Sequence, residues 1–270
     1  MKAIVYTEYG SPEVLQLAEM AKPTPQGNQL LIKIYAAAVN QGDRHILGGI
    51  GRMMGEGVFA PKNPRLGADV AGVVEAVGRG VRRFQVGDAV FGDLSAAGRG
   101  SFAEYVLVSE DAPLAHKPAE ISFEQAAAVP LTAVTALQGL RDYGRIQAGQ
   151  QVLINGASGG VGTFAVQIAK AFGSEVTGVA STHKLEIVRS LGADRLIDYT
   201  QEAFTENGQQ YDLIFDTVGN HPLADLRSVL TQRGTYVTTT FMPAVAVQGK
   251  WLTLISNQKF YNMMSKPNTA

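Results

Sequence analysis

The sequence feature that most constrains the fold is a glycine-rich run at residues 156–162, Gly-Ala-Ser-Gly-Gly-Val-Gly, which directly follows a short apolar segment at 152–155. Behind the run, apolar residues recur at helical spacing: Val161, Phe164, Ala165, Ile168 and Phe172. A buried strand, a tight glycine turn and a helix in this order predict a βαβ unit of a parallel sheet. Because such a helix begins with free N–H groups and the positive end of its dipole, we expect the turn to bind a pyrophosphate. A tight turn without a ligand is the alternative.

The sequence pattern changes near the middle of the chain, from short strand-like runs to helical segments that alternate with apolar runs. This change predicts two domains at 1–122 and 123–270. The second half alternates helical segments with apolar runs and predicts an α/β domain with a doubly wound parallel sheet. Its expected strands are at 152–155, 176–180, 195–197, 213–216, 236–239 and 259–264. The first half predicts a compact, mostly antiparallel barrel with a mobile surface loop at 48–57. Its expected strands are at 30–38, 70–77, 88–91 and 102–108.

Composition excludes several classes of protein. The chain has 23 Lys and Arg against 24 Asp and Glu, so no overall charge attracts nucleic acid or an anionic membrane. It has no Cys, which excludes disulfides, thiolate nucleophiles and cysteine-ligated zinc. The longest apolar stretch, at 126–137, is shorter than the ~18 residues that span a bilayer, and the N-terminus is unlike a signal peptide. We expect a cytoplasmic protein that binds neither nucleic acid nor membrane.

The residues after the second expected strand bear on which dinucleotide binds. Enzymes that use NAD usually place Asp or Glu there to bond the ribose hydroxyls. Here no carboxylate occurs before Glu186, whereas Ser181 can donate to a 2′-phosphate and Lys184 can neutralise part of its charge. The sequence therefore favours NADPH over NADH, although Lys184 can also be an ordinary solvated residue. The residues expected to hold the pyrophosphate are Ser158, Gly159, Gly160, Val161 and Gly162.

The run from Gly149 through the glycine turn to Gln167 and Lys170 resembles the signature of the zinc-free quinone oxidoreductase (zeta-crystallin-like) branch of the medium-chain dehydrogenase/reductase superfamily. Other family marks are at 38–40, 67–72, 84–88, 102–105, 130–132, 191–194 and 216–219. The resemblance implies a GroES-like β-barrel domain followed by a Rossmann domain. Members usually return to the barrel after the sixth Rossmann strand, and we expect this return to be missing here. Members commonly pair their last Rossmann strands, which implies a homodimer through residues 260–264.

The same resemblance implies several contacts with the cofactor. Thr132 is expected to contact the nicotinamide amide, Val218 and Phe241 to lie near the cofactor, and Tyr199 to face the adenosine phosphate. A half-buried tyrosine after a strand is an equal alternative for Tyr199.

The expected zinc ligands are replaced. Zinc-dependent relatives begin the loop at 40–45 with a Cys ligand and carry a His where this chain has Ala68. Asn and Ala cannot replace these ligands, and the four His show no ligand spacing, so we expect no metal site.

The expected chemistry is hydride transfer from NADPH to a quinone or an α,β-unsaturated carbonyl. Without a metal, the reaction depends on positioning and on hydrogen bonds to the developing oxyanion. The Asn40 amide can supply such a bond, and His45 or water the proton. A solvated His45 and a structural Asp43 are the alternatives for these residues. Two other functions stay open: a zinc-free NAD(P)-dependent alcohol or aldehyde oxidoreductase, and a non-catalytic NADPH-binding structural or regulatory protein.

Overall fold

The computed structural model describes residues 1–52 and 57–268, and these form two compact units. The first comprises Met1–Leu131 together with Pro267 and Asn268, and the second comprises Thr132–Lys266. The sequence placed the division between residues 122 and 123. Helix α2 (Phe123–Ala127) belongs to the first unit because its buried Ala126 and Ala127 pack against Ala71 of that unit's sheet. Part of the loop expected at 48–57, residues 53–56, lies outside the described residues.

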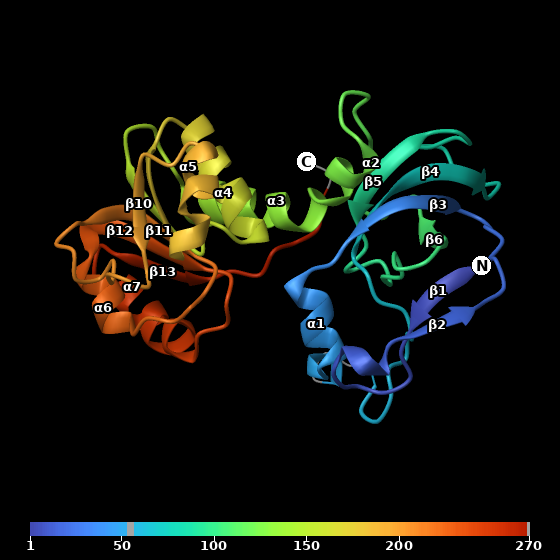
Figure 1. The fold of residues 1–270 in the computed structure, drawn as a ribbon, viewed down its shortest axis with the longest axis horizontal. Coiled ribbons are helices and arrows are strands. Elements are labelled where there is room, and N and C mark those ends of the chain that lie inside the picture. The colour runs from blue at the N-terminus through green and yellow to red at the C-terminus, as the bar shows by residue number, and fades with distance from the viewer. Residues whose placement is uncertain (53–56, 269–270) are drawn as a thin grey trace. The chain divides into compact units, whose positions relative to one another are not determined.

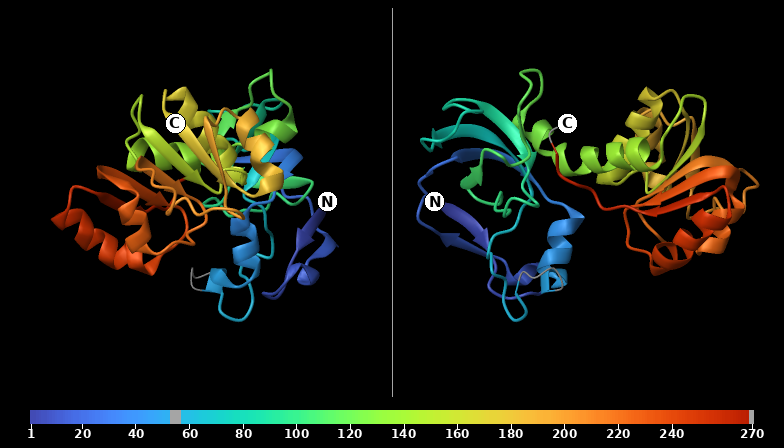
Figure 2. Two further views of the ribbon diagram at one scale, coloured as in Figure 1. Left: turned by 60° about the vertical axis from the view of Figure 1, so that its left-hand side comes forward. Right: turned by 180° about the vertical axis from the view of Figure 1, so that it is seen from behind.

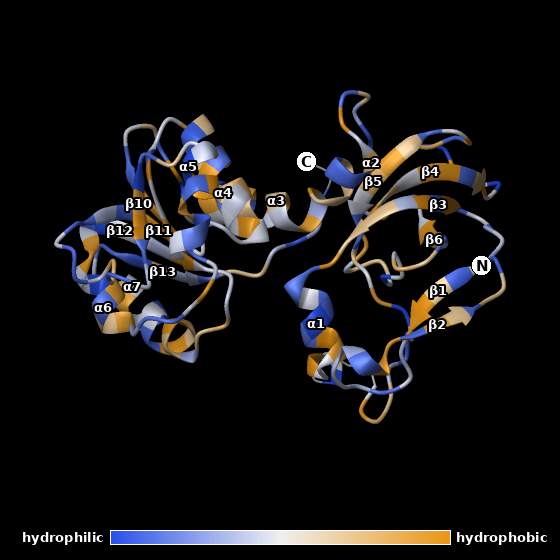
Figure 3. Ribbon diagram, in the orientation of Figure 1, coloured by the Kyte–Doolittle hydropathy of each residue, from blue (hydrophilic) through white to orange (hydrophobic). Residues whose placement is uncertain are grey.

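The first unit is built on a five-stranded antiparallel sheet in the order β6-β3-β4-β5-β7 (Figure 1). Its strands are β3 (Gln29–Ala38), β4 (Asp69–Val77), β5 (Ala89–Asp93), β6 (Tyr105–Ser109) and β7 (Leu114–His116). Two further strands, β1 (Lys2–Val5) and β2 (Gln16–Glu19), pair as a separate hairpin. The four strands expected in this half are confirmed. Their apolar residues form one buried core, visible as hydrophobic colour along β3, β4 and β6 (Figure 3).

One expected boundary in the first unit is wrong. The strand expected at 102–108 begins only at Tyr105, because Phe102 and Glu104 bond β1 and only the carbonyl of Glu104 continues along β3, where it accepts from the amide of Ile34 at 2.9 Å. The amide of Ile4 donates to the carbonyl of Phe102 at 2.8 Å, and that of Glu104 donates to the carbonyl of Lys2 at 3.0 Å. Short helices complete the unit: α1 (Gln41–Leu47) and the 3₁₀ turns Pro12–Val14 and Ile50–Arg52.

The second unit contains a six-stranded, fully parallel sheet in the order β10-β9-β8-β11-β12-β13. Its strands are β8 (Gln151–Asn155), β9 (Glu175–Ala180), β10 (Arg195–Asp198), β11 (Tyr211–Asp216), β12 (Leu230–Thr238) and β13 (Lys259–Asn262). In chain order this is 3-2-1-4-5-6, the order of dinucleotide-binding Rossmann domains. All six expected strands are confirmed. β12 begins earlier than expected, at Leu230, because its polar first residues hide the apolar pattern although Leu230 pairs with Tyr211.

Helices cover both faces of this sheet, as the two views of Figure 2 show. On one face lie α3 (Pro130–Leu137), the π-helical segment η3 (Gln138–Tyr143), α4 (Gly160–Ala171) and α5 (Leu185–Ser190). On the other face lie α6 (Leu223–Ser228), the π-helical η5 (Val245–Gly249) and α7 (Lys250–Ile255), while the 3₁₀ turn η4 (Thr182–Lys184) precedes α5. Adjacent residues of β8 separate the two cores: Val152 and Ile154 join the first, and Leu153 joins the second. Within the described residues, no helix is long and apolar enough to cross a membrane.

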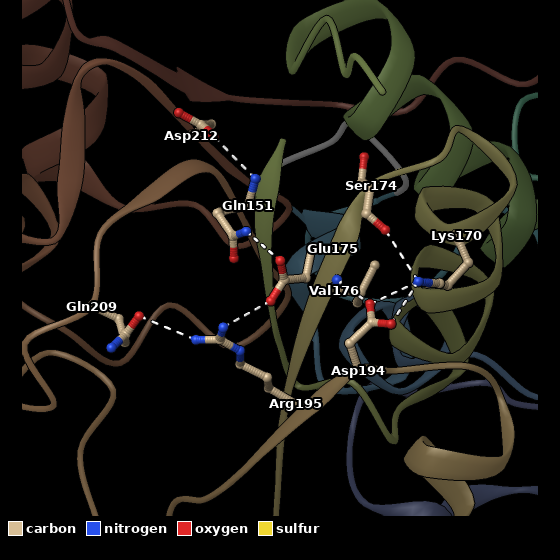
Figure 4. A network of polar contacts seen from close by, with 9 residues as sticks. All are labelled: Gln151, Lys170, Ser174, Glu175, Val176, Asp194, Arg195, Gln209 and Asp212. Atoms are coloured by element: carbon tan, nitrogen blue, oxygen red, sulfur yellow. Dashed lines mark hydrogen bonds and ion pairs between the residues drawn. The ribbon is translucent and has the colours of Figure 1, made fainter. Parts of the chain in front are cut away.

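A polar network closes the edge of the sheet at which β8, β9 and β10 begin (Figure 4). Lys170 of α4 is paired with Asp194 at 2.7 Å, and Asp194 also accepts from the amide of Val176 at 2.7 Å. Glu175 is paired with Arg195 at 3.0 Å. The network ties α4 to β9 and β10 at the edge opposite to the glycine-rich turn, so it is structural.

Candidate active site

The glycine-rich turn is locked against the neighbouring strands. Gly156 has a φ of +82°, and a Cβ there would lie 2.3 Å from Oγ1 of Thr217. A Cβ on Gly162 would lie 2.1 Å from the carbonyl oxygen of Gly156, so the first turn of α4 passes directly over the end of β8. The amide of Ala157 donates to the carbonyl of Val179 on β9 at 3.0 Å. Backbone therefore approaches backbone here in a way that only glycine permits.

The start of α4 leaves room for an anionic group. Gly159 caps the helix in an extended conformation and has no side chain to bond the first helical amides, which by position have no partner within the helix. The nearest heavy atom to a Cβ built on Gly160 is Cγ2 of Thr132 at 3.2 Å, and Ser158 lies beside the cap half-buried. The turn opens between β8 and β11, where the strand order reverses and open α/β sheets bind ligands. This cradle fits a pyrophosphate.

Three residues expected to recognise a 2′-phosphate follow two paired strands. Ser181 follows β9 and Tyr199 follows β10, and the preceding residues Ala180 and Asp198 are paired in the sheet. The amide of Lys184 donates to the carbonyl of Ser181 at 2.8 Å, which closes η4. Lys184 and Tyr199 are exposed, so both side chains are available to a ligand.

Asp198 is a carboxylate at this edge that the sequence reasoning missed. It accepts hydrogen bonds from the hydroxyls of Thr182 and Thr200, the latter at 2.7 Å. The bond from Thr182 is the main reason why the pKa of Asp198 lies below its ordinary value. The sequence reasoning examined only the end of β9 for a carboxylate. The parallel pairing of β9 with β10 is what brings Asp198 beside that end.

The loop that carries Val218 is held by a buried carboxylate at the end of β11. Asp216 is completely buried, and its Oδ1 accepts from the amides of Val218 and Gly219 at 2.8 and 2.9 Å and from Nδ2 of Asn155 at 2.9 Å. Its Oδ2 accepts from the hydroxyl of Tyr236 at 2.7 Å. Four donors, from strands β8 and β12 and from the loop after β11, therefore converge on this carboxylate.

A second loop presents Phe241 near the same edge. The side chain of Asn262 on β13 accepts from the amide of Met242 at 3.2 Å and donates to its carbonyl at 2.8 Å. Phe241, directly before Met242 in the chain, is 75% exposed, and Val218 is 45% exposed. A Cβ on Gly219 would lie 2.9 Å from Cβ of Thr240, so the two loops lie against each other. The structure thus brings both expected apolar residues to the carboxyl edge of the sheet.

In the first unit, Asn40 and Asp43 form the start of α1. Asn40 is the N-cap, and its amide donates to Oδ2 of Asp43 at 2.8 Å. Oδ1 of Asp43 accepts from the amide of Gly67 at 3.2 Å. Burial raises the pKa of Asp43. These bonds support the structural interpretation of Asp43.

Asp69 is the partner of Asn40 that the sequence reasoning gave no role. It is completely buried at the start of β4, and its Oδ2 accepts from Nδ2 of Asn40 at 2.9 Å. Its Oδ1 accepts from the amide of Leu131 at 2.9 Å. Burial raises the pKa of Asp69 to about 7. His45, by contrast, is exposed on α1, where its Nε2 lies 3.3 Å from Nε2 of Gln41.

Comparison with known proteins decides the family. The model of the alcohol dehydrogenase GroES-like domain matches residues 26–119, and that of zinc-binding dehydrogenases matches residues 160–262. The 2-methylene-furan-3-one reductase of Solanum lycopersicum is 42% identical over 228 residues, which are 81% of this chain and 57% of that protein. The chloroplastic quinone-oxidoreductase homolog of Spinacia oleracea is 36% identical over 274 residues, 96% of this chain and 80% of that protein. The chain belongs to the medium-chain dehydrogenase/reductase superfamily, in its zinc-free quinone oxidoreductase branch.

Solved structures agree with this family. The structure of Escherichia coli quinone oxidoreductase complexed with NADPH has a TM-score of 0.83 at 28% identity, covering 98% of this chain and 81% of that chain. The prediction of a GroES-like domain followed by a Rossmann domain is confirmed. This medium-chain dehydrogenase chain spans little more than half the length of the tomato reductase, 57%.

Proposed function

We propose that this chain transfers hydride from NADPH to a quinone or an α,β-unsaturated carbonyl. The observation that carries the proposal is the glycine cradle at the switch point of a 3-2-1-4-5-6 sheet, with Ser181, Lys184 and Tyr199 at the next two strand ends. The E. coli relative was solved with NADPH, and the tomato relative is named as a reductase of an enone. The description of the E. coli structure supports the cofactor, and the two names together support the substrate class.

Different residues of the second unit bind different parts of the cofactor. The first amides of α4, from Gly160 to Gly162, hold the pyrophosphate, and Ser181 with Lys184 and Tyr199 holds the 2′-phosphate. Thr132 beside Gly160 bonds the nicotinamide amide, while Val218 and Phe241 cover the ring. When bound, NADPH supplies the hydride.

The first unit stabilises the charge that forms on the substrate. In a conjugated carbonyl the incoming negative charge spreads onto oxygen, so a neutral donor is sufficient. Nδ2 of Asn40 donates one proton to Asp69, and its second proton, which has only a long contact of 3.5 Å with the carbonyl of Ala38, is the one that bonds the substrate oxygen. Water or the exposed His45 supplies the proton that completes the reduction, to carbon in an enone and to oxygen in a quinone.

The cofactor assignment is tested by binding. Titration with NADPH and NADH should give a lower Kd for NADPH, and Lys184→Met should remove about tenfold of that preference because one charged contact to phosphate is worth ~1.5–3 kcal/mol. Lys250→Met is the matched control: Lys250 is exposed on α7, on the opposite face of the sheet from α4 and α5, and the variant should leave both affinities unchanged. Tighter binding of NADH to the native chain would contradict the assignment.

Turnover then separates the functions that the sequence left open. Oxidation of NADPH by a quinone or an enone supports the proposal, and Asn40→Ala should lower kcat about 100-fold, the effect of removing one oxyanion donor. Reduction of saturated aldehydes instead identifies an alcohol or aldehyde oxidoreductase. Tight NADPH binding without any turnover identifies a binding protein.

We also propose that the chain forms a homodimer through β13. β13 is the last strand of its sheet and pairs with β12 on one side only, and the exposed Trp251 and Leu254 on nearby α7 supply apolar surface. Sedimentation should give a dimer for the native chain and a monomer for Leu254→Glu. A native monomer at micromolar concentration contradicts this proposal. The expected cytoplasmic location stays a prediction, to be tested by cell fractionation.

A further inference from the structure

The buried carboxylate of Asp69 holds the residue on which the proposed reduction depends. Asp69 is the first residue of β4 and is completely buried. Its Oδ2 accepts from Nδ2 of Asn40 and its Oδ1 from the amide of Leu131, each at 2.9 Å. One side chain therefore joins the start of α1, the start of β4 and the first turn of α3.

These bonds decide which way the Asn40 amide points. The two ends of an amide group are nearly equal in shape, but an ionised carboxylate only accepts hydrogen bonds, so the Nδ2 end must face Asp69. The second Nδ2 proton has a contact with the carbonyl of Ala38 at 3.5 Å, at the outer limit of a hydrogen bond. That weakly held proton is the one left for a substrate oxygen.

The bond to Leu131 acts on the helix that carries Thr132. Leu131 lies in the first turn of α3, directly before Thr132. Holding the Leu131 amide fixes where this helix begins. The same carboxylate thus bonds Asn40 directly and also bonds the residue before Thr132. Asn40 and Thr132 are the two residues that the reduction is expected to use.

We propose that Asp69 is a positioning residue for the carbonyl reduction, which leaves the second Asn40 amide proton to the substrate oxygen and anchors the helix start before Thr132. The inference rests on the proposed function. A carboxylate is needed because two N–H donors face it. An amide at this position has one acceptor oxygen, so one of the two donors would meet another N–H group.

The surroundings of Asp69 make this role depend on pH. The pKa of Asp69 is raised to about 7, chiefly by burial and also by the neighbouring carboxylates Asp93 and Asp43, against the bonds from Asn40 and Leu131 that lower it. Arg99 in turn faces Asp43. Above about pH 7 both oxygens of Asp69 accept freely. Below it a proton occupies one of them, and the Asn40 amide is held less firmly.

The first test reads the Asn40 amide directly and needs no activity. In ¹⁵N-labelled native protein, the side-chain NH₂ signal of Asn40, assigned by its loss in Asn40→Ala, should titrate with a midpoint near pH 7. In Asp69→Asn it should not titrate. Asp93→Asn is the matched control, since Asp93 is also buried but bonds the amide of Ser95 at 2.7 Å. Because Asp93 raises the pKa of Asp69, this variant should keep the titration and shift it to lower pH.

The second test reads the reaction. With saturating NADPH, kcat/KM of native protein for an enone should rise with pH through about 7, and Asp69→Asn should lower kcat about tenfold and lose this rise. If Asp69→Asn does not fold, Asn40→Ala carries the test and should lose the same rise. An Asn40 signal that is flat between pH 5.5 and 8.5 overturns the inference. A titrating signal in a protein without turnover instead overturns the proposed function alone.

Discussion

The hydroxyl of Tyr236 offers the sharpest test of how the cofactor edge is held together. Tyr236 is completely buried on β12 and donates to Oδ2 of Asp216 at 2.7 Å. Burial, and then the nearby Asp216, raise the pKa of Tyr236, so the hydroxyl stays protonated as a donor. Tyr236→Phe removes this donor and leaves a buried carboxylate oxygen without it. A hydrogen bond to a charged group contributes ~1.5–3 kcal/mol, and we expect a loss of about 2–3 kcal/mol.

The same unit supplies a matched control. Tyr211 on β11 is equally buried, but its hydroxyl accepts from Nδ2 of Asn207 at 3.4 Å, a long and uncharged bond. Tyr211→Phe removes the same atom and should cost less than about 1 kcal/mol. For a unit of this size the difference corresponds to a fall in Tm of roughly 5 °C or more for Tyr236→Phe relative to Tyr211→Phe.

The assay is urea denaturation of the native protein, of the single variants Tyr236→Phe, Tyr211→Phe and Asp216→Asn, and of the double variant that combines Tyr236→Phe with Asp216→Asn. In Asp216→Asn the charge on the acceptor is gone, so the cost of Tyr236→Phe should fall by at least about 1 kcal/mol, which is the coupling between the two residues. Equal losses for the two tyrosine variants, or a coupling near zero, would show that the hydroxyl only fills space and that Asp216 is not the centre of this edge.

Three further outcomes follow from single contacts. Gly162→Ala places a Cβ 2.1 Å from the Gly156 oxygen and should weaken NADPH binding by about tenfold or more in calorimetry. Gly208→Ala meets no neighbour within 4 Å but has a φ of +73°, so it should lower stability and leave NADPH binding unchanged. Because the pKa of Asp69 is raised from 3.8 to about 7, native stability should fall as pH rises between these values, by up to ~1.4 kcal/mol per unit, and Asp69→Asn should flatten this slope in denaturation series. Lys170→Met breaks the half-exposed pair with Asp194 and should cost about 1 kcal/mol or less, and less again in 1 M salt.

The parts of the fold that the sequence predicted are those encoded by neighbouring residues. The glycine turn at 156–162 shows its strand, its turn and its helix within one short stretch, and the structure confirms all three. The predicted start of β12 was wrong because Thr231 to Gly234 carry no apolar alternation. Leu230 already pairs with Tyr211, and after an irregularity in the register the pairing resumes at Thr235 with Leu213. Local pattern therefore predicts elements well when burial repeats along the chain, and less well where a partner strand imposes the structure.

The candidate site likewise contains residues that local sequence predicts and residues whose position depends on distant segments. Ser181 and Lys184 could be proposed from the sequence because they lie within a few residues of the end of β9. Asp198 was missed because its nearness to Ser181 depends on the register of β10 against β9. Asp69 was visible as an acid after Ala68, but its bond to Asn40 spans 29 residues and has no signature in either segment.

Asp69 and Asp216 have the same structural role, but their hydrogen-bond partners and charged neighbours differ. Each is a buried carboxylate at a strand end that accepts from donors on separate segments, so each fixes loops that packing alone leaves free. Asp216 has four donors, and charge-assisted bonds of this number offset much of the cost of burying an ion. Asp69 has two donors and two acidic neighbours, so the cost of burying its charge is poorly offset and its pKa lies near neutral pH. The edge proposed to hold the cofactor is thus tied together by four contacts to Asp216, whereas Asn40, the proposed donor to the substrate oxygen, is held by a carboxylate whose pKa lies near neutral pH.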